Sequence, residues 1–282
     1  MGLVTNYFDR KDLSYFVRGD VLVITRGEWP FEKIELSTLA LLCHQSRRSR
    51  WKDIINAHFE IMQRVTGVET AFYERAHDYA YASSYLAVRI YPNEYIAGVG
   101  EESVIHRRVA EDISAVLVLD FPFGVCNLRP ETTLQWNRTN EELFDLGFAN
   151  LREKYPSTAM MEKIHRVKMW FINGENFFVA NKALELSSLP IPQGTFGALV
   201  GLPNRHTVLV YPIDHMGVVD ALQPFIVVLR GLFKDGPGSI SRSLYWCHKG
   251  ALIKLPYMLN EDELEFNPPP AFLEMMDQLP PQ

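Results

Sequence analysis

Long apolar runs, the residue pattern of an export signal and an excess of basic residues are all missing from this sequence of 282 residues. The most apolar stretch, residues 218–233, is interrupted by Asp220, Pro224 and Arg230, so we expect no membrane span. The first six residues do not have the charged-then-apolar plan of an export signal, which predicts a cytoplasmic protein.

Paired cysteines are also missing. Cys43, Cys126 and Cys247 are odd in number and lie far apart among apolar neighbours, so a disulfide framework or thiolate metal site has little support. The eight histidines show no recognised metal-ligand spacing. We therefore predict no metal and no cofactor.

The charge balance gives no reason to expect a polyanionic partner. The chain has 28 basic and 34 acidic residues and a net charge of -6. One dense basic patch, Arg47-Arg48-Ser49-Arg50 followed by Trp51, could contact phosphates, but a solvated connection after a helix explains it as well. Nucleic acid is therefore an unlikely partner.

The order of apolar patterns predicts hairpins followed by helices rather than strands alternating with single helices. Hairpins are expected at 13–24, 167–180, 197–212 and 243–255, strands at 85–91 and 114–121, and helices from residues 37, 51, 71, 139 and 215. This rhythm is typical of an α+β fold with mainly antiparallel sheet. The similar plans of residues 13–65 and 167–234 suggest two related lobes.

Three local signals make this prediction specific. Thr139 and Glu142 form a capping box, which places the start of a helix. Asn173-Gly174 between two strand-like runs is the strongest short-range hairpin signal. Pro224 is expected to begin a second helix or to kink the one that follows Asp214.

These elements are expected to form two lobes and a tail. The N-terminal α+β lobe covers residues 1–112 and the C-terminal α+β lobe covers 113–258. Residues 259–282 are acidic and rich in proline, so we expect a loosely held tail except around residues 272–276.

The hairpin at 197–212 carries the best candidate site, because its apolar arms meet at the polar residues Asn204, Arg205 and His206. Arg205 could bind an anionic group, and His206 could act as a base with Asp214 as its orienting carboxylate. However, the intervening strand separates His206 from Asp214 by roughly 26 Å. Polar residues are also ordinary turn chemistry, so both interpretations stay open.

Five other residues can also be interpreted either as functional or as purely structural. Asp120 ends an apolar strand and could be a catalytic carboxylate, but a solvated strand end explains it better. Four tyrosines could be surface anchors for a protein partner, or could simply pack: Tyr73, Tyr79, Tyr81 and Tyr85. Of these, we select Tyr79 and Tyr81 as candidate binding residues.

The layout of the C-terminal half resembles a family of bacterial proteins. The resemblance lies in Glu142-Leu143 leading to 150–152, a strand at 177–181, the hairpin at 202–209, and Gly236-Pro237 leading to 244–246. Over roughly residues 110–256 this layout is similar to the DUF1444, or YtpQ-like, proteins. The family often has an acidic residue where this chain has His206. The resemblance implies a cytoplasmic bacterial protein and brings no established activity.

Two hypotheses for function follow. No catalytic constellation is present, which favours a non-catalytic cytoplasmic protein that binds a protein partner or small ligand, as an adaptor or immunity-like factor. The alternative is a hydrolase or transferase that acts on a small anionic substrate at residues 203–206, with Arg205 and His206 in its site. The sequence leaves the strand order and the oligomeric state open.

Overall fold

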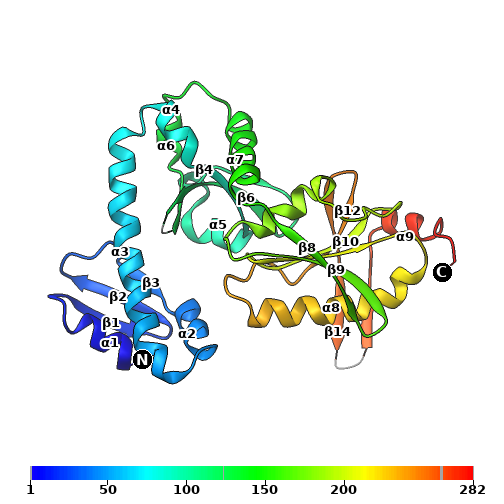
Figure 1. Cartoon of the computed structure of the whole chain (residues 1–282), viewed down its shortest axis with the longest axis horizontal. Helices are drawn as coiled ribbons and strands as arrows, with labels where there is room; N and C mark the ends of the chain where they lie inside the picture. The colour runs from blue at the N-terminus through cyan, green and yellow to red at the C-terminus, as the bar shows by residue number, and fades with distance from the viewer. Residues whose placement is uncertain (1, 123, 261–262, 282) are drawn as a thin grey trace. The chain divides into compact units, whose positions relative to one another are not determined.

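The computed structural model of the chain describes residues 2–122, 124–260 and 263–281 and divides the chain into two compact units (Figure 1). The first unit contains 1–86, 119–127 and 132–137, and the second contains 87–118, 128–131 and 138–282. Along the chain, the first change from one unit to the other follows residue 86. Residues 259–282 belong to the second unit, although 261, 262 and 282 lie outside the described residues.

Both units combine helices with antiparallel strand pairs, so the predicted α+β class is confirmed. Within the described ranges, no helix has the length and apolar character that crossing a bilayer requires.

The first unit is a small sheet packed against helices. Its sheet and helices are β1 (Ser14–Arg18), β2 (Val21–Arg26), β3 (Lys33–Glu35), α1 (Gly2–Phe8), α2 (Ser37–His44) and α3 (Trp51–Arg75). The rings of Phe8 and Phe59 meet edge to face in its core, with centroids 4.7 Å apart. The predicted hairpin at 13–24 and the helices starting at 37 and 51 are confirmed.

The prediction of a separate helix that begins at residue 71 is wrong. Helix α3 continues to Arg75, and a short helix α4 (Tyr79–Ala82) and the turn η2 (Ser83–Tyr85) follow. Helix α4 begins at Tyr79 because the Asp78 side chain caps it, accepting hydrogen bonds from the backbone N–H groups of Ala80 and Tyr81.

A six-stranded sheet dominates the second unit, with strand order β13-β12-β10-β11-β9-β8. Its strands are β8 (Thr158–Ile164), β9 (Val167–Asn173), β10 (Ala198–Asn204), β11 (Thr207–Pro212), β12 (Leu244–His248) and β13 (Ala251–Leu255). Strands β10 and β11 are the central pair, and all five neighbouring pairs are antiparallel. The hairpins predicted at 197–212 and 243–255 are therefore confirmed.

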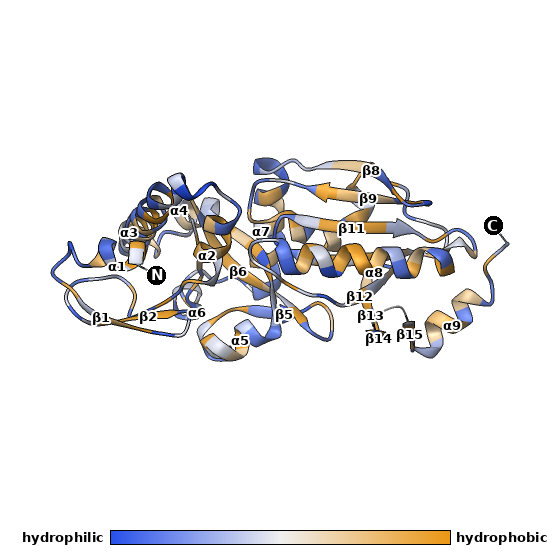
Figure 2. Cartoon of the chain, turned by 90° about the horizontal axis from the view of Figure 1, so that it is seen from below, coloured by the Kyte–Doolittle hydropathy of each residue, from blue (hydrophilic) through white to orange (hydrophobic). Residues whose placement is uncertain are grey.

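Both faces of the central pair are covered, which explains why its arms are apolar almost throughout. Leu199 and Leu209 face the core that contains helix α8 (Gly217–Asp235), whereas Val200 and Val208 face the core that contains the turn η4 (Val179–Leu184). Helix α8 lies along one side of the sheet in Figure 2. It approaches so closely that a Cβ at Gly201 would lie 2.8 Å from a Leu229 side-chain carbon.

The hairpin predicted at 167–180 is wrong in its second strand. Strand β9 pairs with β8 on one edge and with β11 on the other, so no edge is left for residues 175–180. Asn176 instead accepts a hydrogen bond from the backbone N–H of Phe178 at 2.9 Å, and the chain turns into η4, whose Val179 and Ala180 are buried. The strand at 177–181 on which the family resemblance partly depends is therefore absent.

Helix α8 is a single element, so Pro224 does not begin a second helix, and a kink at Pro224 stays a prediction. Pro224 leaves the carbonyl of Asp220 without its helical partner, but Asp220 is exposed and water can take that place. Asp214, the expected cap, is instead bound to Thr195, whose backbone N–H and hydroxyl donate to it at 2.7 and 2.8 Å.

Strands β4 to β7 form a four-stranded sheet, and the helices between and after them include the predicted capping box. The elements are β4 (Leu86–Pro92), β5 (His106–Arg108), β6 (Ile113–Phe121), β7 (Gly124–Asn127), α5 (Asn93–Val99), α6 (Pro130–Thr133) and α7 (Asn140–Lys154). Thr139 and Glu142 make both reciprocal bonds of the box, so that prediction is confirmed. Asp120 on β6 is only 7% exposed, so the expectation of a solvated strand end is wrong.

The C-terminal segment forms regular structure rather than a loose tail. It contains β14 (Tyr257–Asn260), β15 (Glu263–Phe266) and α9 (Pro270–Met276). The exception expected at 272–276 is confirmed: Phe272 is fully buried, and its ring lies 5.3 Å from that of Trp246.

This packing predicts that Phe272→Ala lowers the free energy of unfolding by about 3–5 kcal/mol, because it removes a buried ring and leaves a cavity. Leu273→Ala is the matched control, since Leu273 is its neighbour on the helix but is 49% exposed. Urea denaturation of the full chain measures both. Equal losses in the two variants would mean that α9 is not part of the core.

Candidate functional site

Asn204 fixes the β10–β11 turn from inside the second unit. It is only 3% exposed, its Nδ2 donates to the carbonyl of Leu232 at 3.1 Å, and its Oδ1 accepts from the backbone N–H of His206 at 2.9 Å. A Cβ at Gly236 would lie 2.1 Å from the same Nδ2. Asn204 is thus committed to holding the turn, as the turn interpretation predicts.

His206 is bound on both ring nitrogens. Nδ1 lies 3.1 Å from the carbonyl of Gly174, and Nε2 accepts from Nε of Arg205 at 3.0 Å, which is the pattern of a neutral ring. Burial lowers the pKa of His206, and the positive charges of Arg205 and Arg89 lower it further. Asp214 lies at the other end of β11, so the predicted base and carboxylate do not meet.

Arg89 joins Arg205 at this turn, although the two residues are far apart in the sequence. Arg89 comes from β4, and its Cζ lies 5.9 Å from the centre of the Phe177 ring; the Cζ of Arg205 lies 4.6 Å from the same ring. Sequence reasoning missed Arg89. The available signal was a single basic residue within the otherwise apolar strand.

Within the described part of the chain, the two guanidinium groups have no acidic counterpart. Among the described residues, neither Arg89 nor Arg205 takes part in an ion pair with a carboxylate. Burial lowers the pKa of Arg205 to about 10, and repulsion from Arg89 contributes to the shift. The Nε of Arg89 is buried and has no hydrogen-bond partner. Two cations that are half-buried without compensation are unfavourable, and an anion between them would relieve this cost.

Aromatic rings complete the surroundings of Arg89. The Tyr91 ring lies 4.6 Å from its Cζ and stacks on Tyr95 with centroids 4.0 Å apart. Burial raises the pKa of Tyr91 to about 12, so its hydroxyl stays protonated at neutral pH. We define the anion site by Arg89, Arg205, Phe177 and Tyr91.

Tyr79 and Tyr81 belong to the first unit and form a separate candidate. Tyr79 packs 5.6 Å from the ring of Trp136. Tyr81 packs 5.3 Å from Tyr85 and carries the guanidinium of Arg75 4.0 Å from its centre. Both tyrosines are half-buried. These contacts favour the packing interpretation over a free surface anchor.

Asp112, elsewhere in the second unit, differs from Arg89 and Arg205 because its charge has hydrogen-bond partners within the fold. Asp112 accepts hydrogen bonds from the hydroxyls of Ser241, Ser243 and Tyr245 at 2.9, 2.8 and 2.9 Å. Burial, followed by the charge of Asp112, raises the pKa of Tyr245 far above its usual range. This carboxylate is fully hydrogen-bonded and joins two segments of the chain. In the part of the chain described, no group of three His, Cys, Asp or Glu could hold a metal ion.

Comparison with family models, curated proteins and solved structures gave no match. The resemblance to DUF1444 proteins therefore stays a prediction.

The surroundings of His206 predict a specific pH dependence. Its pKa is lower in the folded chain than in the unfolded chain, so its contribution to stability is complete above about pH 6.5 and is lost as the pH falls below that value. His206→Gln should therefore flatten the decline in the free energy of unfolding at acid pH. His77→Gln, which removes an exposed imidazole, is the control. Identical pH profiles for wild type and His206→Gln would contradict the prediction.

Proposed function

We propose that this chain is a non-catalytic protein that binds a small anionic ligand at the anion site. The observation that carries the proposal is the pair of half-buried guanidinium groups, Arg89 and Arg205, that share the Phe177 ring without an acidic partner among the described residues. Guanidinium groups bind carboxylate and phosphate with paired N–H donors, and such charge-assisted bonds are strongest where water is partly excluded.

The alternative, a hydrolase or transferase at residues 203–206, would use the same anionic substrate but needs a base. His206 is the candidate for that role, and its Nε2 is already occupied by the Arg205 guanidinium. Its pKa is lowered and no carboxylate orients its ring, because Nδ1 faces the Gly174 carbonyl. These observations favour binding over catalysis.

The proposal also includes three expectations from the sequence. The protein is expected to be cytoplasmic, to come from a bacterium, and to act as an adaptor or immunity-like factor. A protein partner would present its anionic group as a carboxylate side chain, and the same arginines would receive it.

The proposal predicts opposite effects of one substitution with and without an anion. Arg89→Met should leave the melting temperature of the free protein unchanged or raise it, because it removes an unpaired buried donor and a like-charge repulsion. The rise in melting temperature that inorganic phosphate, pyrophosphate or citrate causes at constant ionic strength should be smaller in Arg89→Met and Arg205→Met than in wild type.

Arg107→Met is the matched control for this experiment. Arg107 is an exposed arginine of the same unit, and its guanidinium also lies 4.6 Å from a phenylalanine ring, that of Phe144. Its loss should not affect the response to anions. The proposal fails if none of the three anions stabilises the wild type, or if Arg89→Met and Arg107→Met respond equally.

A further inference from the structure

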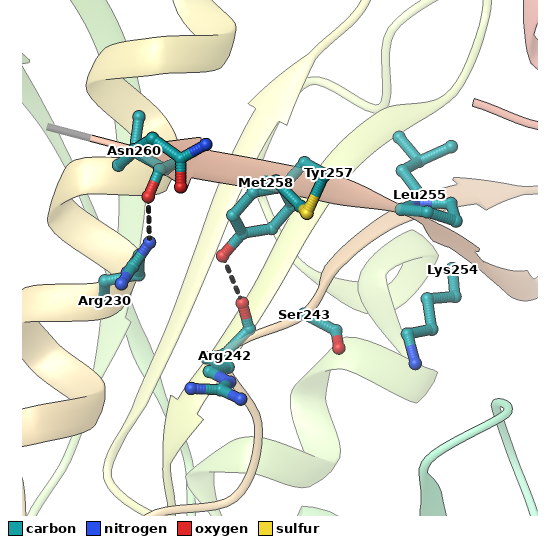
Figure 3. A pocket seen from close by; sticks show the side chains of 10 residues that line it. Arg230, Arg242, Ser243, Lys254, Leu255, Tyr257, Met258 and Asn260 are labelled. Carbon is teal, nitrogen blue, oxygen red and sulfur yellow. Dashed lines mark hydrogen bonds between the residues drawn. The ribbon is translucent and has the colours of Figure 1, made fainter. Parts of the chain in front are cut away.

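A pocket of about 370 Å³ lies in the second unit between helix α8 and strands β13 and β14, and it shares no residue with the anion site (Figure 3). Three cations from different elements surround it: Arg230 from α8, Arg242 from the segment before β12, and Lys254 from β13. None of the ten lining residues is acidic. The pocket therefore concentrates positive charge at one place.

Among the described residues, nearby negative charge does not cancel these cations. Lys254 lies 3.4 Å from Glu111, but that carboxylate side chain is 73% exposed, so the pair is weak and screened by salt. Asp112 contacts the lining residue Ser243, yet three hydroxyl groups already donate to it. Arg242 has no ion pair with a carboxylate among the described residues.

The arginines are available to a ligand on two sides of the pocket. Arg230 uses Nη1 in a long bond of 3.3 Å to the carbonyl of Leu259, which leaves its other N–H groups (Figure 3). The Tyr257 hydroxyl donates to the backbone carbonyl of Arg242 at 2.6 Å and so fixes both the ring and the segment that carries the guanidinium.

The rest of the lining is mixed. Ser243 and Asn260 are polar, whereas Leu255, Pro256, Met258, Leu259 and the Tyr257 ring provide an apolar part. The volume lies in the usual range of about 300–1,000 Å³ for small-molecule pockets, which is larger than a bare inorganic ion needs. A ligand that fits must combine a compact, doubly charged anionic group with a small apolar body.

We propose that this pocket binds the phosphate monoester of a small organic alcohol, with the phosphate between Arg230 and Arg242 and the organic part against Tyr257 and Met258. The forked guanidinium groups match phosphate oxygens, and Lys254 adds a third positive charge. This inference is independent of the function proposed above, because it uses other residues.

Isothermal titration of the full chain with phenyl phosphate, inorganic phosphate and phenol tests the proposal. The titrations are made in the Arg89→Met background, so that the anion site does not contribute. In that background phenyl phosphate should bind, inorganic phosphate should bind at least tenfold more weakly, and phenol should not bind. Arg242→Met and Arg230→Met should each weaken phenyl phosphate binding at least tenfold, since each removes charged hydrogen bonds.

Lys234→Met is the matched control, because Lys234 is an exposed cation of the same helix that does not line the pocket. It should bind phenyl phosphate as the Arg89→Met background does. Arg242 lies outside the helix, so its variant remains informative if Arg230→Met fails to fold. Absence of phenyl phosphate binding, equal affinity for inorganic phosphate, or unchanged binding in Arg242→Met would each overturn the proposal. Loss of binding in Arg89→Met alone would assign the ligand to the other site.

Discussion

The burial of β10 and β11 on both faces is the constraint on which the second unit depends. Side chains such as Leu199 and Val200 point to opposite cores, so neither strand can carry a polar residue along its length without a buried partner. Polar chemistry is confined to the turn. There, Asn204 ties the backbone to the end of α8, and Arg205 is therefore held in one place beside Arg89.

Local signals in the sequence were sufficient for much of this architecture. The hairpin arms and the Thr139 capping box depend on neighbours in the chain, and these elements form where they were expected. The hairpin predicted from Asn173-Gly174 does not form, because distant segments compete to pair with β9. Strands β8 and β11 occupy both of its edges. Arg89 was missed for the same reason, because its approach to Arg205 depends on how β4 packs and not on sequence spacing.

In the second unit, the carboxylate of Asp112 and the guanidinium groups of four arginines differ in the partners they have. The carboxylate of Asp112 is surrounded by neutral hydroxyl donors, which satisfy it without a counter-ion. The guanidinium groups of Arg89 and Arg205 contact aromatic rings but no carboxylate of a described residue, and those of Arg230 and Arg242 line a pocket without an acid among its lining residues. Positive charge is thus left available in two places, whereas the half-buried negative charge of Asp112 is used within the fold.

The three hairpins of the large sheet differ in how their turns are supported. His165 and Lys249 occupy exposed turns with positive φ, of 54° and 48°. The Arg205-His206 turn is instead covered by the segment that contains Gly236 and Gly238. A tag or a reporter domain inserted after His165 or Lys249 should leave the sheet intact, whereas the same insertion after Arg205 would force that segment away from the turn.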